Sequence, residues 1–239
     1  MDYTVAFDKG NATSAAWMDA AGQSGIPTAF VVDQRGEIAW IGHPMSGLDA
    51  VVERVAAGTF DRAAYLRHRE IERELEGKFE VMDLDGALPL IDRLVEADAG
   101  LFGAYAGAKF EILLTVKGDA RAASEYGRAA VRGALKDNAA ALNAVAWTIV
   151  AGENVPSRDL DLALEAAERA AVLTASKDSN VLDTLARVRF ERGDVAGAVA
   201  AQTQAVALET DPEMRAEFEG ALTRYRESAP GAAGGAPKR

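Results

Sequence analysis

Cysteine is absent from all 239 residues of this chain. The protein therefore forms no disulfide, holds no thiolate metal site and performs no chemistry that needs a thiolate nucleophile. Histidine is scarce as well: His43 and His68 are the only two, and we expect them in different domains. Two isolated histidines indicate neither a zinc site nor a nucleophile–base pair. The sequence thus predicts no metal site, no cofactor and no catalytic residue.

Long apolar runs and clusters of basic residues are also missing. The chain has no apolar stretch of about 18 residues, the length that spans a membrane, and Met1 is not followed by a basic and then apolar leader. The net charge is −11, and the lysines and arginines are scattered. Neither a nucleic acid nor an anionic membrane is therefore expected as a partner. Taken as it stands, the sequence predicts a cytoplasmic protein without membrane insertion.

Residues 25–44 contain the clearest local signal, a proline-led β-hairpin. The run that ends at Asp33 is typical of a strand, Gln34-Arg35-Gly36 of a turn, and residues 37–41 of a returning strand. Pro27 stands where the first strand begins. A proline there is either an ordinary edge residue or a cis-proline, and the hairpin alone leaves both open.

The segments around the hairpin follow the order of the second half of a thioredoxin fold. A strand over 2–8 and a helix over 14–21 precede the hairpin, and a helix over 48–57 follows it. The chain resembles in particular the TlpA-like redoxins. Four sequence segments carry this resemblance: Trp17-Met18, Ala21-Gly22-Gln23, Gly25-Ile26-Pro27-Thr28 and Trp40-Ile41-Gly42-His43-Pro44. The resemblance implies that Pro27 is cis and that the backbone of Ile26 pairs with an extended substrate. Gly25, Ile26 and Pro27 are therefore the expected substrate-binding residues.

The reactive half of that family has no counterpart in this chain. Its Cys-x-x-Cys pair lies in the first half of the fold, and no cysteine is present to replace it. The resemblance implies that the chain belongs to the lineage of thiol–disulfide oxidoreductases, and members of that family are often exported to the periplasm. Thiol–disulfide exchange, however, requires a thiolate. We expect this chain alone to be inactive in that reaction. We also expect Met1 to be an internal methionine of a longer reading frame or the start of a truncated one.

A half-sheet of this kind has an open edge at residues 28–33. Exposed strand edges pair readily with other chains. The rival hypothesis is therefore a non-redox adaptor, whose half-sheet is completed by a partner strand or by a second copy of the chain.

Helical periodicity dominates after Gly58, and it repeats. Small or apolar pairs seven residues apart recur at steps of 36, 40 and 35 residues, close to the tetratricopeptide period. The pairs are Ala87 and Leu94, Ala123 and Ala130, Ala163 and Ala170, and Ala198 and Ala205. An irregular helical bundle is the alternative. The predicted fold is a partial thioredoxin-like α/β domain over 1–58, an all-α tetratricopeptide-like repeat domain over 59–228, and a disordered tail over 229–239.

Stacked helix pairs form a concave surface that binds peptides or proteins. Polar residues on or just before the first helices are candidates for partner binding, namely Asn143, Asn180 and Asp183. Asn138 and Asn180 also suit the role of helix N-caps. The phrases Leu142-Asn143-x-x-Ala146-Trp147 and Leu182-Asp183-Thr184-Leu185-Ala186 resemble segments that follow certain TlpA-like domains. The sequence thus predicts protein or peptide binding through the proline loop and a helical groove.

Overall fold

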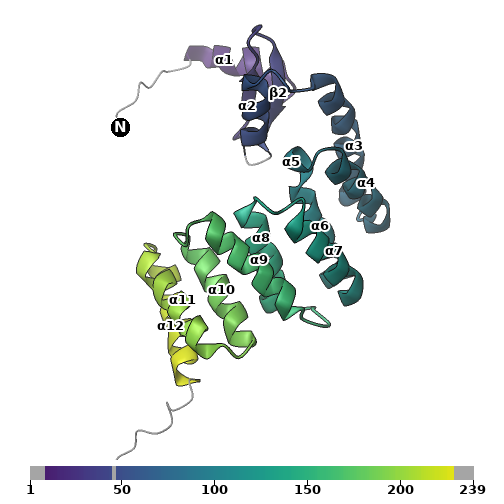
Figure 1. Ribbon diagram of the computed structural model, residues 1–239. Helices are drawn as coiled ribbons and strands as arrows, with labels where there is room; N and C mark the ends of the chain where they lie inside the picture. Colours follow the sequence, from purple (N-terminus) through teal and green to yellow (C-terminus); the bar gives the residue numbers. More distant parts are fainter. Residues whose placement is uncertain (1–8, 45–46, 229–239) are drawn as a thin grey trace, which may run out of the picture. The chain divides into compact units, whose positions relative to one another are not determined.

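The computed structural model describes residues 9–44 and 47–228 (Figure 1). The chain divides into two compact units, Met1–Leu66 and Arg67–Arg239. The division falls within a continuous helix, α3 (Arg62–Glu80), whereas the sequence places a boundary after Gly58. The strand expected over 2–8 and the tail expected over 229–239 lie outside the described residues. The described chain is mostly helical, with one small antiparallel sheet.

The first unit contains the hairpin that the sequence predicts. Strands β1 (Ala29–Val32) and β2 (Ile38–Gly42) pair antiparallel, with Ala29 opposite Gly42. Asp33 organises the turn, because its Oδ1 accepts the backbone N–H groups of Arg35 and Glu37 at 2.9 and 3.0 Å. Gly36 takes the left-handed conformation (φ 80°) that the turn requires.

Helical segments flank this hairpin. Where a helix is expected over 14–21, α1 (Ala12–Ser14) continues into the π-helical η2 (Ala15–Asp19), so the helical segment begins earlier and ends at Asp19. The short 3₁₀ turn η1 (Lys9–Asn11) precedes it, and α2 (Leu48–Ala56) follows the sheet. Trp40 is buried, and its ring lies so close to Gly42 that a Cβ there would come within 2.5 Å of it. Trp17 packs edge-to-face on Phe30, with ring centroids 5.2 Å apart. The first contact lies within β2, and the second packs η2 against β1.

The second unit is a succession of helix pairs. The first helices are α3, α6 (Ala104–Glu111, continued by the π-helical η3, Ile112–Val116), α8 (Ala139–Ala151) and α10 (Ser179–Glu191). Their second helices are α4 (Leu84–Ala97), α7 (Ala120–Arg132), α9 (Leu160–Leu173) and α11 (Val195–Leu208). The short α5 (Ala99–Phe102) precedes α6, and α12 (Pro212–Glu227) packs on α11.

Every second helix begins in the same way. The residue before it is an aspartate whose side chain accepts the backbone N–H three residues on, at 2.9–3.0 Å. These N-caps are Asp83, Asp119, Asp159 and Asp194. Such a cap contributes about 1 kcal/mol to the stability of its helix. The four caps follow one another at the same 36-, 40- and 35-residue steps as the repeated alanines.

The repeated small residues lie in the core. Ala87, Ala123, Ala163 and Ala198 stand four residues after their caps, and each has no exposed surface. Because alanine is small, neighbouring helices approach closely at these positions. In α7 the approach is closer still, since a Cβ on Gly127 would come within 2.7 Å of Leu162. The spacing seen in the sequence therefore corresponds to helix contacts.

Ion pairs also recur between consecutive pairs of helices. Lys117, two residues before one cap, pairs with Asp85, two residues after the preceding cap. Arg192 and Asp161 make the equivalent pair further along the chain. The Asp83-x-Asp85 sequence thus serves to begin α4 and to bind the next helix pair.

A substitution at Met82 tests the turn geometry. Three of the four caps follow a left-handed residue, namely Met82 (φ 56°), Gly118 (φ 65°) and Gly193 (φ 83°). A side chain in this conformation costs roughly 1–2 kcal/mol, and that of Met82 is 73% exposed, so little packing is lost without it. We expect Met82→Gly to stabilise the protein by up to about 1 kcal/mol, a rise in Tm of about 2–4 °C by calorimetry.

Glu80→Gly, in the last turn of α3, is the matched control. It introduces the same flexibility without relieving a left-handed residue, so its Tm should fall. An equal or lower Tm for Met82→Gly than for the wild type would contradict the assigned turn.

Candidate functional site

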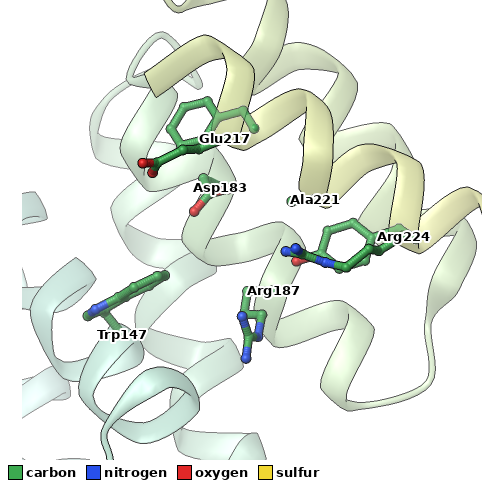
Figure 2. Close-up of a pocket in the computed structure, with 8 residues that line it drawn as sticks. Trp147, Asp183, Arg187, Glu217, Ala221 and Arg224 are labelled. Atoms are coloured by element: carbon green, nitrogen blue, oxygen red, sulfur yellow. The ribbon is translucent and has the colours of Figure 1, made fainter. Parts of the chain in front are cut away.

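A pocket of about 130 Å³ opens between α8, α10 and α12 (Figure 2). It lies in the helical unit and is formed mainly by charged and aromatic side chains. Those used below are Trp147 from α8, Asp183 and Arg187 from α10, and Glu217, Arg224 and Tyr225 from α12. A cavity of about 150 Å³ holds a benzene ring, so this pocket is of the size that receives one side chain of a partner.

Helical spacing explains why the pocket residues face the same way. Asp183 and Arg187 are four residues apart on α10, and Asn143 and Trp147 are four apart on α8, so each pair shares one helix face. Asn143 corresponds to Asp183, and Trp147 to Arg187, when the similar segments of the two helices are aligned. The helices α8 and α10 also pack against each other. First helices of consecutive pairs therefore present equivalent faces to the pocket.

Asp183 is held in place from α11. The Nε2 of Gln202 donates to its Oδ1 at 2.7 Å and also contacts the carbonyl of Phe218 at 3.3 Å. Gln202 has no exposed surface, and its Oε1 receives no hydrogen bond. The corresponding position in the other second helices is Ile91, Gly127 or Ala167. Among these four second helices, only α11 carries a buried amide at this position, and that amide contacts Asp183.

The surroundings of Asp183 disfavour its charged form. Burial raises the pKa of this carboxyl above its ordinary value, and the nearby Glu217 acts in the same direction. The hydrogen bond from Gln202 and the charges of Arg187 and Arg224 lower the pKa but do not cancel the effect. Burial likewise raises the pKa of the Tyr225 phenol, whose ring stacks on Phe190 with centroids 4.5 Å apart.

The charged groups of the pocket are not paired with one another. Arg187 Nε binds Glu191 at 3.2 Å instead of Asp183. Within the part of the chain that the structure describes, neither Glu217 nor the guanidinium of Arg224 forms an ion pair. Trp147 is 45% exposed. The pocket therefore offers to a partner two carboxylates that form no ion pair within that described part of the chain, the guanidinium of Arg224 and an aromatic surface.

The three partner-binding residues expected from the sequence take different places. Asp183 lines the pocket. Asn143 lies one turn before Trp147, and its Oδ1 is buried without a hydrogen-bond partner. Asn180 is exposed on α10 and does not line the pocket. It is not the N-cap of α10 either, because Asp178 caps that helix; Asn138 does cap α8, where its Oδ1 accepts from Ala141.

Sequence reasoning missed most of the pocket. Trp147 lies in the segment 142–147, which resembles the segment 182–187. The step of 40 residues between these segments makes Arg187 the counterpart of Trp147. Glu217 and Arg224 lie on α12, beyond the repeated phrases, so no spacing singled them out. Gln202 had a usable signal, since it is the polar residue at a position otherwise filled by Ile91, Gly127 and Ala167.

The proline loop of the first unit is exposed. The Ile26–Pro27 peptide bond is cis, as the family resemblance implied. The side chain of Ile26 is 90% exposed, and the carbonyl of Gly25 accepts a hydrogen bond from Thr28 Oγ1 at 2.6 Å. Gly25, Ile26 and Pro27 therefore lie at the surface, where a partner can reach them.

Residues 9–44 and 47–228 contain neither a cluster of metal-binding side chains nor a membrane-spanning helix. No group of three or more histidine, aspartate or glutamate side chains there is arranged to hold a metal ion. None of the helices in that part of the chain is long and apolar enough to cross a membrane.

The carboxyl of Asp183 provides a test of the pocket's electrostatics. Because its pKa is raised in the folded protein, ionisation of Asp183 favours unfolding, and stability is lost as the pH rises through that pKa. In Asp183→Asn the side-chain Oδ1 keeps the hydrogen bond from Gln202, and the group carries no charge to desolvate. We expect its Tm at pH 7 to exceed that of the wild type by about 2–4 °C.

The difference should shrink below pH 3.8, the ordinary pKa of aspartate, where the wild-type carboxyl is protonated as well. Glu153→Gln, in the loop before α9, is the control and should leave the Tm unchanged at both pH values. A lower Tm for Asp183→Asn at pH 7 would contradict the described environment.

No protein-family model matches this chain, and no curated protein is similar to it. Its function must therefore be inferred from the geometry of the pocket and the proline loop.

Proposed function

We propose that this chain is a protein- or peptide-binding member of the redoxin lineage. The helical unit is a tetratricopeptide-like array that holds the partner in the pocket between α8, α10 and α12. The first unit is the second half of a thioredoxin-like fold, whose loop of Gly25, Ile26 and Pro27 pairs with an extended segment of the partner. Without cysteine, this chain binds its partner and does not exchange disulfides with it.

One observation carries this proposal: polar and aromatic side chains from equivalent faces of α8 and α10, and from α12, gather around one pocket. The half-exposed Trp147 supplies a broad contact surface, and tryptophan and arginine are frequent among the residues that dominate binding energy at interfaces. Arg224 and Glu217 are free for a partner. The regular caps and buried alanines of the second helices support the repeat array that presents these faces.

Binding of a peptide pool tests this function. A fluorescently labelled pool of random decapeptides, measured by anisotropy, should bind the full chain and bind Trp147→Ala at least about fivefold more weakly, because the exposed indole is the largest contact surface in the pocket. The control is Val172→Ala, which removes an exposed apolar side chain (77%) at the end of α9, outside the pocket. Equal binding of the pool by the wild type and Trp147→Ala would contradict the proposal.

A non-redox adaptor is the second candidate, and the sheet favours it. Among residues 9–44 and 47–228, β1 is paired with β2 alone, and Val32 is 43% exposed. Such an edge accepts a strand from another copy of the chain. In this case the pocket has the same binding role, and the half-sheet is completed by dimerisation.

Light scattering after size exclusion distinguishes the two candidates. The adaptor predicts a dimer of about twice 25.2 kDa that dissociates in Val32→Pro. Because the Asp33 N–H donates to Glu37 and N–H groups alternate along a strand, the Val32 N–H points to the open edge, and proline removes this donor. The redoxin hypothesis predicts a monomer for the wild type and for the proline variant. A monomeric wild-type chain at high concentration would rule out completion by a second copy.

A further inference from the structure

Two carboxylates of the pocket form no ion pair among the described residues. Asp183 uses one oxygen to accept from Gln202, and in the described residues its other oxygen accepts no hydrogen bond. Glu217, also on the wall of the pocket, has neither a hydrogen bond nor an ion pair there. In the view of Figure 2 both carboxylates and the indole of Trp147 border the same part of the pocket. An arginine or lysine side chain entering there would meet two acceptors.

Trp147 suits the same kind of guest. Its exposed indole offers an aromatic face, which attracts cations, and tryptophan attracts them most strongly. A guanidinium group is flat, stacks on aromatic rings and donates several hydrogen bonds in one plane. Two carboxylates beside an indole therefore match an arginine side chain more closely than an apolar one.

The buried Gln202 side chain, which holds Asp183 in place, reduces the stability of the fold. Burial of an unpaired polar atom such as Gln202 Oε1 costs roughly 1–3 kcal/mol, and the equivalent places in the other helices are filled by Ile91, Gly127 or Ala167. The amide keeps the Asp183 carboxylate fixed by the 2.7 Å hydrogen bond. A carboxylate that is fixed before binding loses little freedom when a cation arrives.

Binding of an anionic group by the two arginines of the pocket is the competing possibility. Arg187 is already bound to Glu191, which leaves Arg224 for an anion. Arg224 and Glu217 are both exposed to water, where ionic contacts are weak, so Asp183 decides between the two possibilities. Asp183 is half-buried, so a cation placed against it interacts in a lower dielectric. The chain's net charge of −11 also attracts basic partners from a distance. The observations therefore favour a cation.

We propose that the pocket between α8, α10 and α12 receives one basic side chain of the bound partner, preferably arginine, between Trp147, Asp183 and Glu217. This inference rests on the proposed function, since it names the chemistry of the segment that the groove binds. Arg224 borders another part of the pocket and forms no ion pair among the described residues, so it is available to an acceptor that flanks the basic residue.

Four short peptides test the inference on the full chain. Each is an acetylated and amidated Gly-Ala-X-Ala-Gly, with arginine, citrulline, leucine or glutamate at X. Citrulline keeps the shape of arginine without its charge. Binding is followed by NMR through the indole N–H signal of Trp147, which is assigned by its loss in Trp147→Phe.

The arginine peptide should shift the Trp147 signal saturably and bind about tenfold more tightly than the citrulline peptide. Asp183→Asn should reduce its affinity by about tenfold, and Glu217→Gln by a smaller factor. Because we expect Asp183→Asn to be more stable than the wild type, its weaker binding would not reflect unfolding. Glu227→Gln removes the same charge from α12 outside the pocket, so it should bind the arginine peptide as the wild type does.

The remaining outcomes separate this inference from the proposed function. Equal binding of the arginine and citrulline peptides, or tighter binding of the leucine or glutamate peptide, would overturn the preference for a basic residue and leave peptide binding intact. If none of the four peptides shifts the Trp147 signal, while the random pool still depends on Trp147, the inference is wrong and the function stands. If the pool fails as well, both are wrong.

Discussion

Close contact between helices at small buried residues is the constraint on which the helical unit depends. Ala123, Ala163 and Ala198 have no exposed surface and stand four residues after an aspartate N-cap. The cap determines where each second helix begins, and the small residue determines how closely it approaches its neighbours. Because both recur at the same steps, the first helices α8 and α10 present equivalent faces, and the pocket forms where these faces meet α12.

The pocket departs from this regular packing at one point. Gln202 places a buried amide where the other second helices carry small or apolar residues, and it holds Asp183 in a setting that raises the pKa of that carboxyl. Both features reduce stability, since a buried unpaired atom and a half-buried charge each cost free energy. Departures of this kind are expected where a site serves binding. The same two residues thus link a local loss of stability to the proposed preference for a basic partner.

Much of the fold could be predicted from the sequence, because its signals are local or periodic. The hairpin was visible in the turn before Glu37, and the repeat steps in the alanines that proved to be buried. The pocket was less accessible. Asp183 was predicted from its place on a first helix, but Glu217 and Arg224 lie on α12, which repeats no earlier phrase. Their arrangement depends on how α12 packs on α11, a long-range contact that no spacing in the sequence encodes.

The central claim is that the face of α8 and α10 around Trp147 contacts a partner through a basic residue. A photo-crosslinking phenylalanine analogue at Ala144, introduced in the producing cell, tests it most directly. Ala144 is exposed on α8 one turn before Trp147, so the probe reacts with what lies against this face while Trp147 is kept. Mass spectrometry of the crosslinked segments should find arginine or lysine at or beside the crosslinked residue, and Asp183→Asn should reduce the yield. Crosslinks confined to the chain itself, or spread over segments without basic residues, would contradict the account.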